Sequence, residues 1–229
     1  MEPRFKAIAD HALLVTFAEE ISEEAHSAVL ALDAALAAQT PAGLIEAVPA
    51  MVNLLVTFDP LETDHVAMET GVRACAGAMK PVLSAGVTHR VQVCYDAPFS
   101  PDLEAVSSAT GLTPEAVANA HLAGDYQVLM YGFSPGYAYL SGVPEAIRVP
   151  RKPAPVRDVP AGSVIIAGPQ CLITTLTMPT GWSIIGRSPT KVLTGDPDTP
   201  FLFDVGDRVT FERIDAATFA RLDKAGDHG

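Results

Sequence analysis

The stretch Tyr131-Gly132-Phe133-Ser134-Pro135-Gly136-Tyr137-Ala138-Tyr139-Leu140-Ser141-Gly142 opens a segment, residues 131–189, that is punctuated throughout by glycine and proline. Glycine permits backbone conformations that a Cβ forbids, and proline fixes φ. Aromatic side chains between such residues form rigid walls with a polar tip, which suits a small-molecule pocket. From composition alone, ordinary turns between barrel strands explain the same stretch better.

Short apolar runs around this stretch predict β-strands. They cover residues 126–131, 163–167, 172–177, 182–185 and 208–214. Many short strands with turn signals between them favour a barrel or a sandwich. A short helix and a disordered tail are expected over residues 215–229.

Two helices are predicted between residues 102 and 124, directly before these strands. The first covers residues 102–109 and has Asp102 near its N-cap. The second begins at Thr113-Pro114-Glu115, where threonine caps the helix and proline takes its first position, and it ends before Gly124. His121 then falls in the last turn, where the negative end of the helix favours the protonated imidazole.

The N-terminal part of the chain follows the order strand, helix, strand, strand, helix, strand. Apolar periodicity places these elements at residues 12–17, 22–39, 44–48, 51–58, 61–79 and 90–95. This order is the ferredoxin-like double split βαβ pattern, although the last strand could instead open a second domain. With a boundary near Gly86, we expect an α+β chain with a ferredoxin-like domain over residues 1–86 and a β-barrel domain over residues 87–229.

The composition predicts a globular chain and argues against several partners. Hydrophobic residues make up 48% of the 229 residues, which is enough for a buried core. The formal net charge of −12 argues against nucleic acid and against an anionic membrane. We expect no signal peptide and no membrane span, and three scattered cysteines indicate reduced thiols in the cytoplasm.

A set of ordered motifs resembles the carboxyltransferase subdomain C/D family. In chain order the motifs are Tyr95 with Phe99 and Pro101-Asp102-Leu103, His121, residues 132–140, Pro150-Arg151, residues 159–164, Gly181-Trp182 and residues 186–189. The family includes the B subunit of 5-oxoprolinase, allophanate hydrolase subunit 1, a domain of urea carboxylase and a sporulation-kinase inhibitor. The resemblance extends over nearly the whole chain.

The resemblance implies that the barrel is cyclophilin-like and that the chain works in a complex. The implied partner is a second cyclophilin-like subunit, of the type of the 5-oxoprolinase C subunit or of allophanate hydrolase subunit 2, together with a third subunit. The implied activity is ATP-dependent hydrolysis of an amide or lactam, most simply 5-oxoproline to glutamate, or an allophanate- or urea-related amide. The complex uses ATP, and this chain shows no P-loop and is expected to bind no cofactor or metal. The alternative is a regulatory protein that resembles a histidine-kinase inhibitor.

In the enzymatic interpretation, the candidate catalytic residues are His121, Asp102 and Arg151. His121 is the proton carrier, Asp102 orients it or binds a substrate N–H, and Arg151 binds a carboxylate or phosphate. All three are predicted to face one cavity, and His121→Ala is predicted to lower activity about 10²-fold with folding nearly intact. The structural alternatives are a helix-end cap for His121, an N-cap for Asp102 and a surface ion pair for Arg151.

Further residues of the glycine-rich segment are candidates for substrate binding. They are Phe133, Pro135, Gly136, Tyr137, Tyr139, Gln170 and Arg187. Trp182 is expected in the core, and Cys171 is not expected to be a nucleophile because no histidine lies near it in the sequence.

The sequence departs from the family pattern inside the expected pocket. Val156 stands near the place of a second arginine, with Arg157 one step later. Residues 170–174 lack the family's glycine and tyrosine, and Thr180 replaces a glycine before Gly181-Trp182. These departures leave the substrate open.

Overall fold

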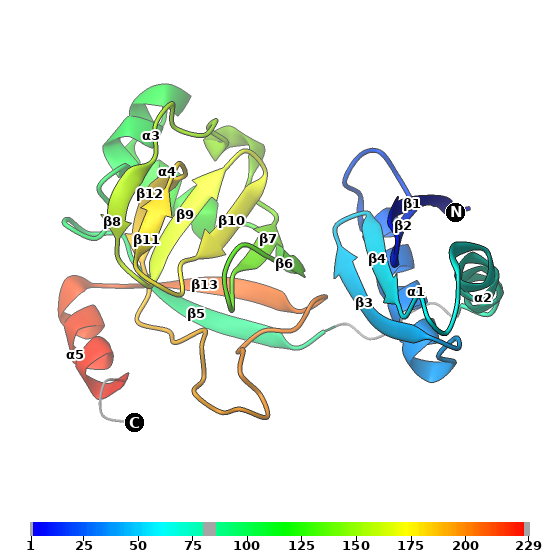
Figure 1. Ribbon diagram of the computed structural model, residues 1–229. Helices are drawn as coiled ribbons and strands as arrows, with labels where there is room; N and C mark the ends of the chain where they lie inside the picture. The colour runs from blue at the N-terminus through cyan, green and yellow to red at the C-terminus, as the bar shows by residue number, and fades with distance from the viewer. Residues whose placement is uncertain (1, 80–85, 227–229) are drawn as a thin grey trace. The chain divides into compact units, whose positions relative to one another are not determined.

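The computed structural model describes residues 2–79 and 86–226 (Figure 1). The chain divides into two compact units, Met1–Ala85 and Gly86–Gly229. The predicted end of the second helix at Pro81, residues 84 and 85 of the predicted domain boundary and the predicted tail at 227–229 lie outside the described residues.

The N-terminal unit is a four-stranded antiparallel sheet with two helices. Its elements are β1 (Arg4–Ala9), β2 (Ala12–Thr16), α1 (Glu23–Ala38), β3 (Leu44–Ala50), β4 (Asn53–Phe58) and α2 (His65–Gly77). Neighbouring strands follow the order β1-β2-β4-β3. Both helices contribute to the same hydrophobic core as the central strands, so they cover one face of the sheet (Figure 1).

Local sequence accounts for these elements. Leu54, Val56 and Phe58 alternate with less buried residues along β4, as expected for a strand with one buried face. Ser22 caps α1, because its Oγ accepts the Ala25 N–H at 3.2 Å.

The fourth strand of this sheet differs from the expectation. The strand predicted over residues 90–95 lies in the barrel, as the alternative interpretation had it, and β1 pairs with β2 in this sheet. The strand β1 is an edge strand and is mostly exposed, so its sequence carries no clear apolar alternation.

The second unit contains a closed barrel within residues 86–226, with the strand order β10-β7-β6-β13-β5-β12-β9. Its strands are β5 (Thr88–Cys94), β6 (Tyr126–Tyr131), β7 (Ala138–Ser141), β9 (Ser163–Ala167), β10 (Gln170–Ile173), β12 (Ser183–Arg187) and β13 (Arg208–Ile214). Strands β5 and β13 run parallel, and the other neighbours run antiparallel. The predictions for β6, β9 and β13 are confirmed.

Further elements surround the barrel. They are α3 (Leu103–Thr110), α4 (Pro114–Leu122), the 3-10 turn η1 (Glu145–Ile147), α5 (Ala216–Gly226), and a two-stranded ribbon of β8 (Val156–Val159) and β11 (Met178–Thr180). Helices α3 and α4 pack against each other and against η1 at one end of the barrel (Figure 1). The helix start at Thr113-Pro114 is confirmed, because Thr113 Oγ1 accepts the Ala116 N–H at 3.1 Å. No helix in the described ranges is both long and apolar enough to cross a bilayer.

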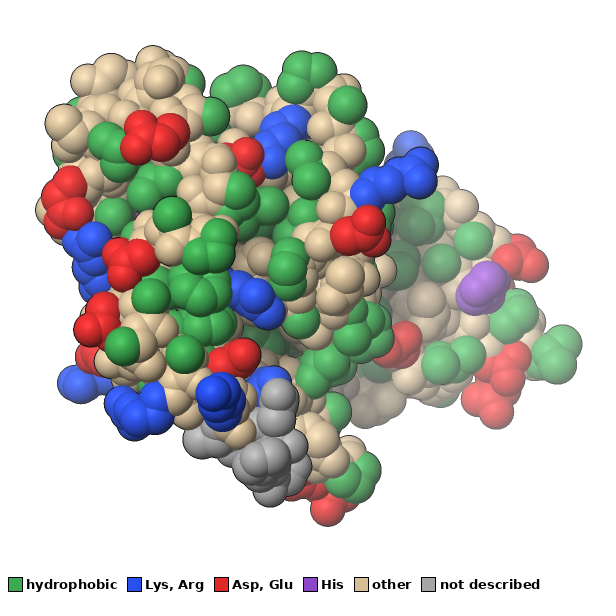
Figure 2. Space-filling model, turned by 90° about the vertical axis from the view of Figure 1, so that its left-hand side faces the viewer, with side chains coloured by type: hydrophobic (Ala, Val, Ile, Leu, Met, Phe, Trp, Pro, Cys, Tyr) green, Lys and Arg blue, Asp and Glu red, His purple; other side chains and the backbone are tan. Residues whose placement is uncertain are grey.

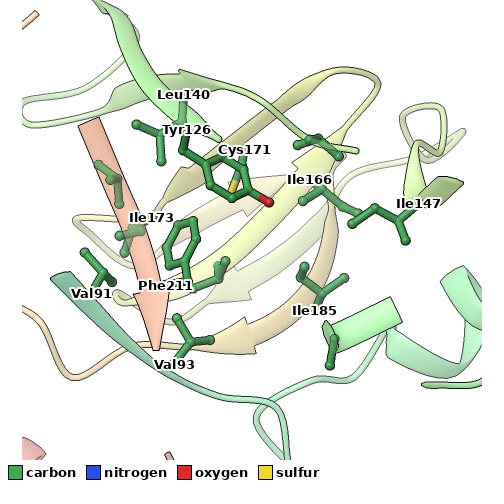
Figure 3. Close-up of a cluster of buried hydrophobic side chains, with 14 of the residues drawn as sticks. Val91, Val93, Tyr126, Leu140, Ile147, Ile166, Cys171, Ile173, Ile185 and Phe211 are labelled. Atoms are coloured by element: carbon green, nitrogen blue, oxygen red, sulfur yellow. The ribbon is translucent and has the colours of Figure 1, made fainter. Parts of the chain in front are cut away.

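Strands β9 and β10 bury both of their faces. Ile166 and Cys171 lie in the barrel interior, where Figure 3 shows Cys171 beside Tyr126. Ile165 and Leu172 belong to a second hydrophobic cluster, on the opposite face of the same strands. The barrel wall therefore has an apolar core on each side, and the outer one leads to the candidate site.

Candidate functional site

A cavity of about 140 Å³ lies over the outer hydrophobic cluster of the barrel. We call it the aromatic cavity. It is lined by Phe133, Tyr137, Tyr139, Arg151, Ile165, Leu172, Pro179, Thr180, Gly181 and Trp182. It therefore brings together four of the predicted site residues, Phe133, Tyr137, Tyr139 and Arg151.

A row of aromatic rings forms one wall. The ring centroids of Phe133 and Tyr137 lie 5.5 Å apart, those of Tyr137 and Tyr139 6.4 Å, and those of Tyr139 and Trp182 5.9 Å. These separations suit tilted and edge-to-face packing of rings. Burial, with a smaller effect of Tyr139, raises the pKa of Tyr137 to about 12, so its hydroxyl stays protonated and can donate a hydrogen bond.

Arg151 supplies the positive charge of the cavity. Its Cζ lies 5.6 Å from the centroid of the Trp182 ring, which is within the range of a cation–π interaction. In the described part of the chain its guanidinium forms no ion pair with a carboxylate. The guanidinium is thus free to bind an anionic group of a ligand.

Asp102 lies outside this cavity and fixes the chain beside it. Its Oδ2 binds Lys152 Nζ at 2.5 Å and accepts the Ile184 N–H at 2.7 Å. The Lys152 N–H donates to the Gly181 carbonyl at 2.6 Å. Lys152, the residue next to Arg151, is therefore linked to the chain before Trp182 through Gly181 and to the chain after it through Asp102 and Ile184. Asp102 stands at the N-cap position of α3 but makes no capping hydrogen bond with its side chain.

Pro135 and Gly136 shape the turn that carries Phe133. The Pro135 carbonyl accepts the Thr175 hydroxyl at 2.8 Å. Gly136 has a φ of 71°, and a Cβ there would lie 2.8 Å from Leu193. Neither residue lines the aromatic cavity. Phe133 also has a positive φ, 71°, and its side chain is 75% exposed at the rim.

His121 lies in the barrel core. It is fully buried, with Nδ1 2.7 Å from the Tyr95 hydroxyl and Nε2 3.4 Å from Cys171 Sγ. Its ring packs on Tyr126 and Phe211, at centroid distances of 5.1 and 4.5 Å. Figure 3 shows Tyr126, Cys171 and Phe211 turned toward one another in this core.

Two predictions about His121 were wrong: that it faces one cavity together with Asp102 and Arg151, and that its imidazole is protonated. The residue does occupy the last turn of α4, but burial lowers the pKa of His121 from 6.5 to about 3. Desolvation outweighs the helix dipole, which contributes roughly 0.3–1 kcal/mol at an exposed helix end. His121 is neutral. It does not line the aromatic cavity, and it does not share a cavity with Asp102 and Arg151.

Cys171 has a histidine neighbour that the sequence did not indicate. His121 is 50 positions away in the chain, and only the packing of α4 on the barrel brings it to 3.4 Å. Burial raises the pKa of the Cys171 thiol well above its usual range. A neutral, fully buried thiol is not a nucleophile at neutral pH.

Two other predicted residues also lie apart from the aromatic cavity. Gln170 begins β10, and its side-chain nitrogen is buried without a hydrogen-bond partner in the described residues. Arg187 ends β12 and lines a different cavity. Trp182 packs in the outer hydrophobic cluster, as predicted, and together with Thr180 it also lines the aromatic cavity. Among the described residues no cluster of histidine, cysteine and acidic side chains could hold a metal ion.

The sequence identifies the family of this barrel protein. It matches the family model of the carboxyltransferase domain, subdomain C and D, over residues 3–203. A relative from Bacillus subtilis (strain 168), named as the B subunit of 5-oxoprolinase, is 33% identical in an alignment of 223 residues that covers 92% of this chain and 92% of the relative. The chain belongs to the carboxyltransferase subdomain C and D family, as its ordered motifs predicted.

Solved structures share the fold of this chain. The protein TTHA0988 is 35% identical, with a TM-score of 0.80 over 91% of this chain. The match covers 40% of TTHA0988, so this chain spans less than half the length of that protein. Urea amidolyase from Kluyveromyces lactis is 14% identical with a TM-score of 0.81, over 99% of this chain and 16% of that one, and shares the fold.

Proposed function

We propose that this chain is the non-ATP-binding subunit of an ATP-dependent complex that opens 5-oxoproline to glutamate. The aromatic cavity carries the proposal, because an arginine without an acidic partner in the described residues meets a wall of aromatic rings there. Relatives named as the B subunit of 5-oxoprolinase support this substrate over an allophanate- or urea-related amide. The same names support an enzymatic role over inhibition of a histidine kinase.

The chemistry of the cavity matches a small cyclic carboxylate. The Arg151 guanidinium would bind the carboxylate through two parallel hydrogen bonds. The rings of Tyr139 and Trp182 would pack against the ring carbons, and the protonated Tyr137 hydroxyl would donate to the lactam oxygen. ATP bound by another subunit would activate the amide, since this chain has no P-loop. This chain would therefore orient the substrate.

Surface features support a heteromer. Large hydrophobic side chains of the barrel unit are exposed at Phe133, Val156, Leu176 and Phe201. Figure 2 shows hydrophobic side chains gathered across one face of this unit, with charged groups of both signs between them. Such a surface suits a protein partner. We propose that a second subunit, with a cyclophilin-like barrel, binds this chain in a 2:2 arrangement. A third subunit would bind ATP. Three unpaired cysteines suit the reducing cytoplasm.

Reconstitution tests the proposal. The chain is combined with candidate second and third subunits and with ATP, and glutamate formed from 5-oxoproline is measured. We expect glutamate from the full complex and none from the isolated chain. No glutamate with every subunit present would refute the substrate, and turnover by the isolated chain would refute the dependence on partners.

A further inference from the structure

A second cavity of about 240 Å³ opens on the barrel unit, and none of its lining residues belongs to the aromatic cavity. Its lining includes Arg187, Ser188 and Pro189 of the Gly186-Arg187-Ser188-Pro189 motif, which the proposed function leaves without a role. We propose that this cavity, here called the arginine cavity, is a binding site for phosphate, either inorganic phosphate or the phosphoryl group of a small molecule.

The side chain of Arg187 is held in place from two sides. Its Nε donates to the Ala161 carbonyl at 3.2 Å. Its Cζ lies 5.6 Å from the centroid of the Phe219 ring, a buried residue of α5. Arg187 forms no ion pair with a carboxylate in the described ranges. An anchored guanidinium with unpaired terminal nitrogens is preorganised for an oxyanion, because it loses little side-chain entropy on binding.

The loop after Arg187 adds hydroxyl groups in a fixed arrangement. The Ser188 N–H donates to the Gly162 carbonyl at 2.7 Å, and Ser188 Oγ accepts the Thr190 N–H at 3.1 Å. Gly162 has a φ of 81°, and a Cβ there would lie 2.4 Å from the Ser188 carbonyl oxygen, so only glycine allows this approach. The hydroxyl protons of Ser188 and Thr190 remain as donors for a phosphate with several acceptor oxygens.

Charged side chains of both signs line the arginine cavity. Arg187 and Lys191 are its cationic lining residues, and Asp223 on α5 is its acidic one. Asp223 must therefore oppose an anion that Arg187 attracts, and the two residues should affect phosphate affinity in opposite directions.

The site can be tested on this chain alone, so its outcome is separate from that of the proposed function. Calorimetry with inorganic phosphate compares the wild type with Arg187→Met and Asp223→Asn. We expect Arg187→Met to weaken binding about tenfold or more, because it removes charge-assisted hydrogen bonds. Asp223→Asn should strengthen binding about threefold, because it removes a like charge.

Controls separate a specific site from general charge effects. Arg90→Met removes an exposed arginine that pairs with Glu212, and it should leave phosphate affinity unchanged. Thermal unfolding checks that Arg187→Met is folded. Arg187→Lys keeps the charge without the Nε hydrogen bond, so it should bind phosphate with intermediate affinity. Tighter binding of glycerol phosphate than of inorganic phosphate would identify a phosphoryl group as the ligand, and the reverse would identify free phosphate. Failure of the wild type to bind either, equal binding by Arg187→Met, or weaker binding by Asp223→Asn would overturn the proposal.

Discussion

Asp102 and Lys152 form an ion pair at 2.5 Å that links the start of α3 to the segment carrying Arg151. Their side chains are 20% and 19% exposed, so solvent screens the pair only partly. The same carboxylate oxygen of Asp102 accepts the Ile184 N–H from β12. Asp102 is therefore a positioning residue, and it acts on the cavity only through Lys152 and the barrel backbone.

Asp102→Ala is expected to lower both stability and substrate affinity. It leaves the Ile184 N–H and the Lys152 ammonium without their acceptor, so the free energy of unfolding should fall by about 1–3 kcal/mol. Substrate affinity should fall because Arg151 loses its fixed neighbour. Urea unfolding and the KM of the reconstituted complex measure these effects. Asp125→Asn, which loosens an exposed pair with Arg208, should change neither. A rise in KM without any loss of stability would mean that Asp102 touches the substrate itself.

Arg151→Met should lower kcat/KM for 5-oxoproline in the reconstituted complex by about 10²-fold. The change removes a two-point interaction with a carboxylate, which costs roughly 2–3 kcal/mol. Arg151→Lys keeps the charge but not the planar fork, so it should recover only part of the loss. Stability should fall by no more than about 1 kcal/mol, because the Arg151 guanidinium forms no ion pair in the described residues and loses only its cation–π contact with Trp182. Wild-type kcat/KM in Arg151→Met would exclude the aromatic cavity as the carboxylate site.

His121→Ala should destabilise the barrel. It opens a void in the core and leaves the Tyr95 hydroxyl without its partner, so we expect a loss of about 2–5 kcal/mol in the free energy of unfolding. This reverses the sequence-based expectation that folding would stay nearly intact. His11→Ala, at an exposed histidine, is the matched control and should change stability by less than about 0.5 kcal/mol.

Because of His121, the wild type should also become less stable as the pH decreases. The unfolded histidine binds a proton below its ordinary pKa of 6.5, whereas the folded one does so only near pH 3. The unfolded state therefore holds more protons between these values. The contribution of His121 to the free energy of unfolding is complete above pH 6.5. Below that value it decreases by up to about 1.4 kcal/mol for each pH unit. Urea unfolding at pH 7 and pH 5 should show a smaller gap between wild type and His121→Ala at pH 5. An unchanged gap would contradict the buried neutral imidazole.

Local patterns in the sequence were enough to predict several elements. The run of Thr113, Pro114 and Glu115 marks the start of α4, because cap and proline preferences depend on nearest neighbours. The strands β6, β9 and β13 follow from short apolar runs between turn residues. The edge strand β1 and the short strands β7, β8 and β11 were missed, because three or four residues, or an exposed edge, give too little periodicity.

The arrangement of the candidate site depends on contacts that no local pattern contains. His121 was placed correctly on its helix, but its burial is set by the face on which α4 meets the barrel. Alternation along a strand places Cys171 and Leu172 on opposite sides of the barrel wall, but the sequence could not show that a second hydrophobic cluster covers the outer side. For this reason the core position of Trp182 was predicted, but its place in the wall of the aromatic cavity was not.

Phe133 combines an exposed ring with a strained backbone, and two substitutions can separate these properties. A non-glycine residue at φ 71° costs of order 1–2 kcal/mol, and this ring gains little from burial because it is 75% exposed. Phe133→Gly removes both the ring and the strain, whereas Phe133→Ala removes only the ring. We expect the glycine variant to be more stable than the alanine variant by about 1 kcal/mol. If the ring covers the substrate, both variants should raise KM of the reconstituted complex alike. A KM that rises in the glycine variant alone would show that the rigid turn, not the ring, serves the site.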